Sequence, residues 1–201
     1  MKDNAVLPLG SFEVKSGSLI VSDPCYEREE RCCGSVVNAA NGKWFAAARL
    51  RTYHYKLPSQ KEPANDTRVR ELLAWTEPVV WKGNQVYGGG PWEELSFAVG
   101  VDSGQAGVFD DKAYQDNKYG EQLLREQWAA GKGNLTPADA QKDPEPCYWY
   151  WAVCNLTAEG AGGALQGGVC VSSGFGDGNY SAYYRRWSKA KLVVAIKIVF
   201  L

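Results

Sequence analysis

The end of the chain constrains the fold more than any other stretch. From Lys191 to Leu201 the sequence is nearly continuously apolar, and Lys197 is the only charged residue that interrupts the run. A strand with one solvated face alternates apolar and polar residues, whereas a strand with both faces covered is apolar throughout. The pattern therefore predicts a buried central strand, in a sheet that is covered on both sides.

Most of the remaining chain consists of short strand-like runs separated by turns. The 22 glycines and nine prolines, together with eight Trp and eleven Tyr, favour many short strands over a helical bundle. Helical spacing predicts two helices, at Thr67–Trp75 and Lys118–Ala130. The other predicted strands are Phe12–Val14, Leu19–Val21, Lys43–Tyr55, Pro78–Trp81, Leu95–Val101, Cys147–Leu156 and Gly167–Ser173.

These segments show neither an internal repeat nor a β-α-β alternation. We therefore predict a mainly β (α+β) fold, as an antiparallel β sandwich or barrel-like domain with two short helices. A chain of 201 residues is long enough to bury a sizeable core, and we expect one domain over residues 1–201.

Charge and hydropathy exclude several partners. The net charge is −1 and there is no long basic run, so we do not expect nucleic-acid binding. No stretch approaches the roughly 20 apolar residues of a membrane span, and the N-terminal residues lack the apolar stretch of a signal peptide. We therefore expect a cytoplasmic protein with no membrane partner, whose six cysteines are mostly reduced.

Several kinds of catalytic or cofactor site are missing from the sequence. His54 is the only histidine, which excludes a multi-histidine metal site. There is no phosphate-binding Walker loop, no dinucleotide fingerprint and no G-x-S-x-G nucleophile elbow. The cysteine spacings match no familiar zinc site. We predict no cofactor and no bound metal.

Three loops hold the most unusual residue combinations: Ser22–Tyr26 (SDPCY), Gly100–Asp111 (GVDSGQAGVFDD) and Val171–Tyr183 (VSSGFGDGNYSAY). Closely spaced glycines let a backbone take positive φ and approach another group closely. A glutamine among small residues can bind a ligand or pin a neighbouring loop, and the sequence does not choose between the two. We predict a ligand site lined by Asp23, Tyr26, Asp102, Ser103, Gln105, Asp177 and Tyr180.

The same loops also offer groups for catalysis. Asp102, Asp110, Asp111 and Asp177 could act as acid and base, or hold Ca²⁺ or Mg²⁺, if the fold brings them together. Cys25 could be a nucleophile if a nearby cation lowered its pKa. Each has a simpler explanation, because an Asp-Gly-Asn turn needs its own aspartate and a cysteine beside proline can be an apolar plug.

These phrases carry a family resemblance. The chain resembles an uncharacterised family of bacteria and their phages, domain of unknown function 4241, through Ser22–Tyr26, Val101–Asp110 (VDSGQAGVFD) and Ser172–Tyr180 (SSGFGDGNY). The closing apolar strand Val193–Phe200 also fits. The resemblance implies a one-domain fold with three marked loops, and it implies no substrate or activity.

Two classes of function follow from these observations. We expect a non-catalytic bacterial or phage protein that binds a small-molecule ligand or another protein, in a role such as toxin immunity or host–phage conflict. The alternative is a hydrolase or transferase that uses the loop carboxylates or Cys25, with or without a divalent cation. In a third interpretation the loops are structural turns, and a partner protein binds the aromatic strands elsewhere.

Overall fold

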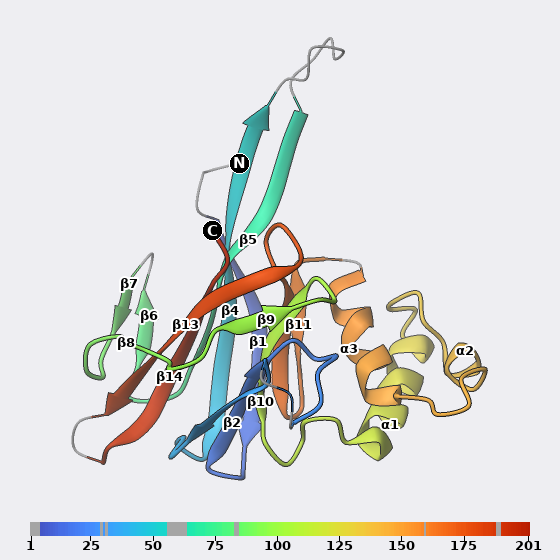
Figure 1. Ribbon diagram of the computed structural model, residues 1–201, viewed down its shortest axis with the longest axis horizontal. Coiled ribbons are helices and arrows are strands. Elements are labelled where there is room, and N and C mark those ends of the chain that lie inside the picture. Colours follow the sequence, from blue (N-terminus) through green and yellow to red (C-terminus); the bar gives the residue numbers. More distant parts are fainter. Residues whose placement is uncertain are drawn as a thin grey trace.

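The computed structural model describes residues 5–28, 30, 32–55, 64–82, 85–158, 160–187 and 190–201. The described residues form fourteen strands and three helices (Figure 1). The first ten strands are β1 (Val6–Val14), β2 (Ser18–Ser22), β3 (Gly34–Val37), β4 (Gly42–Tyr55), β5 (Ala64–Trp75), β6 (Val80–Lys82), β7 (Gln85–Tyr87), β8 (Glu93–Glu94), β9 (Val99–Val101) and β10 (Gln105–Asp110). The remaining elements are α1 (Asn117–Ala129), α2 (Pro137–Ala140), α3 (Tyr148–Ala158), β11 (Gly162–Leu165), β12 (Gly168–Ser172), β13 (Gly178–Trp187) and β14 (Leu192–Val199).

Two antiparallel sheets pack face to face. The larger has seven strands in the order β1-β4-β5-β14-β13-β8, with β9 paired to β13, and the smaller has five in the order β11-β12-β10-β2-β3. The main core fills the space between them and includes Trp44, Leu72, Val108 and Ile196, all fully buried. The prediction of a mainly β sandwich is confirmed, whereas the barrel-like alternative is wrong, because the strand orders of both sheets are open.

The closing strand lies where its sequence predicts. β14 pairs with β5 on one side and with β13 on the other, so it is central in the large sheet. Its Ile196 and Ile198 face the core between the sheets, and Val194 and Ala195 join a separate small cluster with Val79. Both faces of β14 are therefore covered, which explains its continuous apolar sequence.

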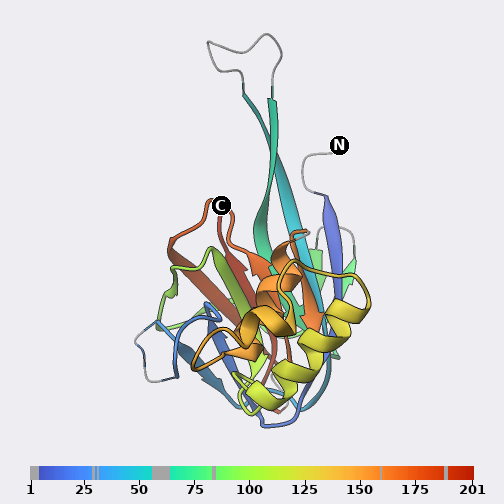
Figure 2. The same ribbon diagram turned by 90° about the vertical axis from the view of Figure 1, so that its right-hand side faces the viewer.

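The helices form a third layer over the small sheet (Figure 2). Trp149 and Val153 on α3 pack with Phe109 and Cys170 of the small sheet in a second buried cluster. α1 runs against α3, and Gly120 is the point of closest approach, because a Cβ there would lie 2.3 Å from the Trp149 Cα. Among the described residues, no helix is long and apolar enough to cross a membrane.

Two element assignments from the sequence are wrong, and together they change the predicted helix count. Thr67–Trp75 is not a helix but part of strand β5, which pairs with β4 from Tyr55↔Ala64 to Phe45↔Trp75. Both faces of this strand carry buried side chains, so its apolar residues imitate helical spacing, and pairing in the sheet overrides local propensity.

The second error is Cys147–Leu156, predicted as a strand with two covered faces. The segment is helix α3, whose buried residues Trp149, Ala152 and Val153 follow helical spacing. Short runs that are apolar throughout do not distinguish a buried strand from a buried helix. The other predicted helix, Lys118–Ala130, is confirmed as α1.

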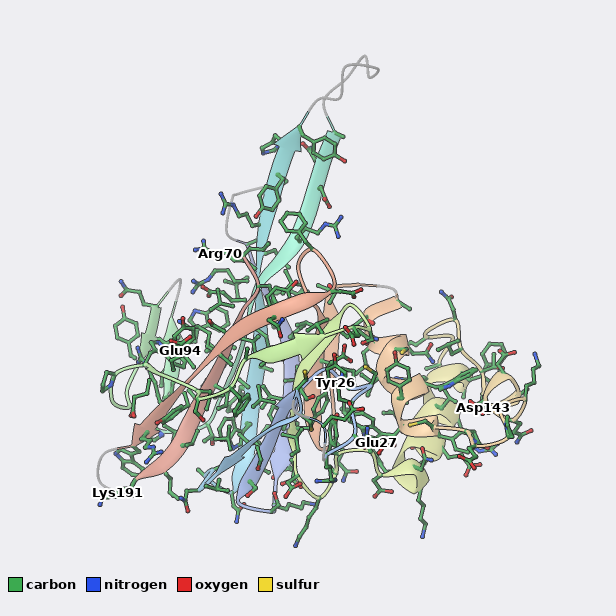
Figure 3. The ribbon with its side chains drawn as sticks, in the orientation of Figure 1. Tyr26, Glu27, Arg70, Glu94, Asp143 and Lys191 are labelled. Carbon is green, nitrogen blue, oxygen red and sulfur yellow. The ribbon has the colours of Figure 1, made fainter. Side chains whose placement is uncertain are left out.

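β4 and β5 extend beyond the rest of the large sheet and project from the body (Figures 1 and 2). The neighbouring strands stop first, since β1 pairs with β4 only as far as Arg49 and β14 pairs with β5 only as far as Glu71. We call residues 50–55 and 64–70 the arm; Arg70, labelled in Figure 3, lies at its base. Two of its residues, Leu50 and Val69, pack on the main core, so the base of the arm is anchored in the body.

Candidate functional site

The first two marked loops meet at one buried carboxylate. Asp23 is fully buried, and its Oδ2 accepts hydrogen bonds from the backbone N–H groups of Asp102 (2.9 Å) and Ser103 (2.7 Å). Its Oδ1 accepts from the Ser103 hydroxyl (2.6 Å) and from the Cys25 N–H (2.9 Å). The three bonds from Asp102 and Ser103 hold the loop between β9 and β10 against the loop after β2, and the bond from Cys25 closes the latter loop on itself. Asp23 is therefore the group that positions the two loops.

The third loop joins the same cluster. The Ser173 N–H donates to the Gly104 carbonyl oxygen (2.9 Å), and β9 pairs with the start of β13, where Gly178 lies opposite Val101. The Tyr180 hydroxyl donates to the Gly176 carbonyl oxygen (2.7 Å) and lies 3.2 Å from that of Ser173. The three loops thus converge at one end of the sandwich, although they lie far apart in the sequence.

A cleft of about 610 Å³ opens beside this loop cluster, and we call it the end cleft. It lies between the base of the arm and the loop 172–176, and the large sheet supplies its apolar residues Leu7, Leu50 and Val69. Gly174 takes a φ of +61°, and a Cβ there would approach the Val69 carbonyl oxygen to 3.1 Å. The lining residues are Leu7, Leu50, Asp66, Thr67, Arg68, Val69, Gly104, Gly160, Ala161, Ser172, Ser173, Gly174, Phe175 and Gly176.

Phe175 is the most unusual residue of this cleft, because 61% of it is exposed in the middle of the loop. Its ring centre lies 5.3 Å from that of Tyr53 on the arm, and the Arg68 guanidinium lies 5.7 Å from the ring centre. Arg68 also binds Asp66 through its Nε (2.7 Å) and donates to the Gly174 carbonyl oxygen (3.3 Å). The arm and the loop therefore hold each other and form one wall of the cleft.

The seven predicted site residues occupy different positions around this cluster. Gln105 is buried, and its amide is used inside the protein: Oε1 accepts from the Thr157 hydroxyl (3.0 Å) and Nε2 donates to the Cys154 sulfur (3.4 Å). Both partners belong to α3, so the Gln105 side chain holds this helix, not a neighbouring loop, against β10. Asp177 is exposed at the turn before β13.

Tyr26 and Asp102 lie together at the surface beside the cluster. Figure 3 shows Tyr26 between the strands and α3. Burial and the neighbouring Asp102 side chain raise the pKa of the Tyr26 hydroxyl, so the phenol stays neutral. Ser103 is partly exposed, but both its hydroxyl and its N–H bind Asp23. Ligand binding by the seven residues stays a prediction; their geometry shows that Asp23, Ser103 and Gln105 already have internal partners.

The environment of Cys25 disfavours a thiolate. Partial burial raises the pKa of the thiol to about 12, and the carboxylates of Asp23 and Asp102 add to the effect. A catalytic cysteine needs the opposite, an electropositive surrounding that lowers the pKa. The residue is exposed, so reagents can reach it.

We expect Cys25 to react slowly with iodoacetamide for this reason. At about pH 8 the folded protein should be alkylated at Cys25 roughly 10–100-fold more slowly than the urea-unfolded chain, after allowing for the greater nucleophilicity of a thiolate of high pKa. Peptide-resolved mass spectrometry measures the rate at this residue alone. Labelling at Cys25 that is faster in the folded protein would instead support the cysteine-nucleophile alternative.

The four loop carboxylates do not form a common site. Asp102 lies before the start of β10 and Asp110 is at its end, and Asp111 pairs with Arg28. Only Asp177 comes near Asp102, because Gly178 lies opposite Val101 in the β9–β13 pair. Across the described part of the chain, no group of three or more His, Cys, Asp or Glu residues is placed to hold a metal ion. Asp110 has an internal role instead, because its Oδ2 accepts from the N–H groups of Lys15 (2.7 Å) and Ser16 (2.8 Å).

Asp110 should make stability depend on pH. Burial acts to raise the pKa of this carboxyl, but the hydrogen bonds from Ser16 and Lys15 outweigh it and lower the pKa below its ordinary value of 3.8. A lowered folded-state pKa stabilises the protein above the unfolded-state pKa, and that stabilisation is lost as the pH falls through the folded-state value. Urea unfolding from about pH 6 to pH 2 should therefore show a smaller loss for Asp110→Asn than for the wild type. Parallel curves for the two proteins would contradict this role.

The sequence did not identify the arm's contribution to the site. Leu50, Thr67 and Arg68 line the cleft, but residues 67–75 read as a helix, so their position beside the third loop was not predictable. The sequence feature that could have indicated the cleft is Phe175. It is a large apolar residue between two glycines, and phenylalanine is not a residue that turns favour.

Comparison with known families gives one match. The family model described as "Protein of unknown function (DUF4241)" matches residues 12–198, which include all three marked loops and most of the closing strand. The chain belongs to this family. No curated protein and no solved structure matches the chain. Membership of the DUF4241 family therefore confirms the resemblance carried by the loops, and the family description assigns no activity to the cleft that they border.

Proposed function

We propose that this chain is a non-catalytic binding protein whose end cleft takes a small-molecule ligand. The observation that carries the proposal is the cleft itself, at about 610 Å³. Ligand pockets in proteins commonly measure about 300–1,000 Å³ and combine an apolar lining with a few polar groups. Here Leu7, Leu50 and Val69 supply apolar surface, while Ser172 and Arg68 supply polar groups at the rim.

The chemistry around the cleft supports binding over catalysis. The hydrolase or transferase alternative requires a free carboxylate pair or an activated thiol. The carboxylate oxygens of Asp23 and Asp110 accept hydrogen bonds from backbone N–H groups, and the pKa of the Cys25 thiol is raised. Asp102 and Asp177 are exposed and adjoin the paired residues Val101 and Gly178, but no hydrogen bond between described residues joins their side chains.

A protein partner is the second candidate. It is favoured by Phe175, which is 61% exposed beside the projecting arm. Aromatic residues are enriched at the centres of protein interfaces, where their large area is buried at low entropic cost. In this version a segment of the partner enters the same cleft, as expected for a role in toxin immunity or host–phage conflict.

The proposal includes a bacterial or phage source and a cytoplasmic location. The source rests on the family resemblance given above. The location is supported by the cysteines, because all six are free thiols, as expected in a reducing compartment.

Thermal unfolding against a panel of nucleotides, sugars, amino acids and other metabolites tests the proposal. A ligand at ten times its dissociation constant should raise the midpoint by roughly 3–6 °C. Gly160→Trp should remove the shift by filling the cleft, since a Cβ at Gly160 meets no atom within 4 Å. Ala138→Trp on α2, away from the cleft, is the matched control and should keep the shift.

The same panel distinguishes binding from catalysis. Each compound that shifts the midpoint is recovered after overnight incubation with the protein, and its mass is measured by mass spectrometry. A compound recovered with its mass unchanged supports a binding protein. Conversion that is lost in Asp102→Ala or Cys25→Ala would overturn the proposal in favour of the enzyme alternative.

A further inference from the structure

Lys197, the one charge inside the closing strand, lies in a second cavity on the outer face of the large sheet. This cavity, which we call the outer-face cavity, measures about 140 Å³ and is lined by Arg49, Glu71, Leu73, Trp81, Val86, Trp92 and Lys197. The hairpin of β6 and β7 contributes Trp81 and Val86, and the sheet contributes the charged residues. The cavity is separate from the end cleft, with which it shares no lining residue.

The sheet register brings the charges together. Arg49 lies opposite Glu71 on the paired strands β4 and β5, and the Arg49 guanidinium binds the Glu71 carboxylate at 2.9 Å. Lys197 on β14 lies opposite Leu73 of β5 on one side and Tyr183 of β13 on the other. One carboxylate and two cations therefore line the same small cavity.

A third cation, on β13, lies beside the cavity but is not one of its lining residues. The Arg185 guanidinium lies 4.6 Å from the centre of the Trp92 ring, and the Lys197 amine lies 4.8 Å from the same centre. The Lys197 amine is also 4.7 Å from the centre of the Tyr183 ring. Three positive charges thus stand against the single negative charge of Glu71, and Arg49 already binds that carboxylate.

Lys197 lacks an anionic partner. No carboxylate oxygen of the described residues lies within 4.0 Å of its amine. Burial lowers the pKa of Lys197; Glu71 acts in the opposite direction, but Arg185 and Arg49 lower the pKa too, so the net effect of the surroundings disfavours the positive charge. Contacts with aromatic rings offset only part of the cost of removing an ammonium group from water. The Arg185 Nη1 donates to the carbonyl oxygens of Val86 and Gly88 (both 3.1 Å), whereas its Nε is buried without a hydrogen-bond acceptor among the described residues.

We propose that the outer-face cavity binds a small oxyanion, as a carboxylate or phosphate group. An anion there supplies the negative charge that Lys197 lacks, the Lys197 ammonium supplies charge-assisted hydrogen bonds, and the positive charge of Arg185 beside the cavity adds to the attraction. The volume of about 140 Å³ accommodates several water molecules, enough for a carboxylate or phosphate group but not for a nucleotide. Such a group is either a free anion or the charged end of a larger ligand lying on the sheet.

Inorganic phosphate and acetate are the probes that test this site. Each is titrated up to about 50 mM at constant ionic strength, with sodium chloride as the balancing salt, and thermal unfolding is followed. A saturable rise of roughly 3–6 °C at ten times the dissociation constant is expected for at least one of them in the wild type. A response to phosphate alone assigns a phosphate ligand, and a response to acetate alone assigns a carboxylate ligand.

Lys197→Met and Arg185→Met should each weaken the response at least fivefold. Lys43→Met is the matched control: Lys43 also lies over an aromatic ring, 5.5 Å from the centre of Phe45, but it does not line the cavity. In chloride alone, Lys197→Met should be as stable as the wild type or more so, since it removes an uncompensated charge.

Two results would overturn the proposal. One is the absence of a saturable rise for both anions in the wild type, and the other is an equal rise in the wild type and in Lys197→Met. If Lys197→Met and Arg185→Met both fail to fold, the NMR resonance of the Trp92 indole N–H tests the site in the wild type. This resonance should shift on titration with the anion that raised the unfolding midpoint, and a resonance that does not shift contradicts the site.

Discussion

Replacing Asp23 with alanine is expected to destabilise the protein by about 3–5 kcal/mol, because it leaves several donors without an acceptor. The carboxylate is fully buried and accepts hydrogen bonds from Asp102, Ser103 and Cys25. Backbone N–H groups at a closed loop junction cannot turn to find other partners. Urea unfolding at neutral pH measures the loss, and an unchanged m-value shows that both states keep their compactness.

Two further variants make this result specific. Asp23→Asn keeps one acceptor oxygen, so its loss should be smaller than that of Asp23→Ala. Asp177→Ala removes an exposed aspartate from a neighbouring loop and should change stability by no more than about 0.5 kcal/mol. A loss below about 1 kcal/mol for Asp23→Ala would contradict the role of Asp23 as the junction of the first two loops.

Gly120→Ala is expected to destabilise the protein by about 3 kcal/mol, although the same change in an exposed helix stabilises by about 1 kcal/mol. The reversal follows from the packing of α1 on α3. A Cβ on Gly120 would lie 2.3 Å from the backbone N and Cα of Trp149, atoms that cannot move without shifting the helix. Trp149 itself is fully buried against Phe109, so there is little room for α3 to retreat.

Lys118→Ala, at an exposed position of the same helix, is the control and should be nearly neutral. Both variants are compared by chemical unfolding under identical conditions. Stabilisation by Gly120→Ala would mean that α1 and α3 are not in close contact, and the helical layer over the small sheet would then be wrong.

The parts of the fold that the sequence predicts correctly are those whose pattern has one interpretation. The closing strand is apolar on both faces, which predicts a central strand. β14 is central in the large sheet. α1 has helical spacing, and its N-terminal cap is Asp116, not the adjacent Asn117. Asn117 instead accepts from the Trp149 N–H at the start of α3 (3.1 Å), a contact that only the tertiary structure defines.

The predictions that failed depend on partners distant in the sequence. β5 carries helix-forming residues, but its long pairing with β4 decides its conformation. For the same reason the sequence indicated the three loops but not their convergence. That convergence depends on hydrogen bonds such as those from Ser103 to Asp23 and from Ser173 to Gly104, which span about 80 and 70 residues along the chain.

The central claim is that the end cleft is a binding site, and NMR mapping of fragment binding to ¹⁵N-labelled protein tests it most directly. We expect fragments from a general library to shift the amide resonances of Gly104, Gly174 and Gly176, which line the cleft, and Gly160→Trp to abolish those shifts. Fragments that shift only resonances elsewhere, or the same cleft resonances in Gly160→Trp as in the wild type, would contradict the account.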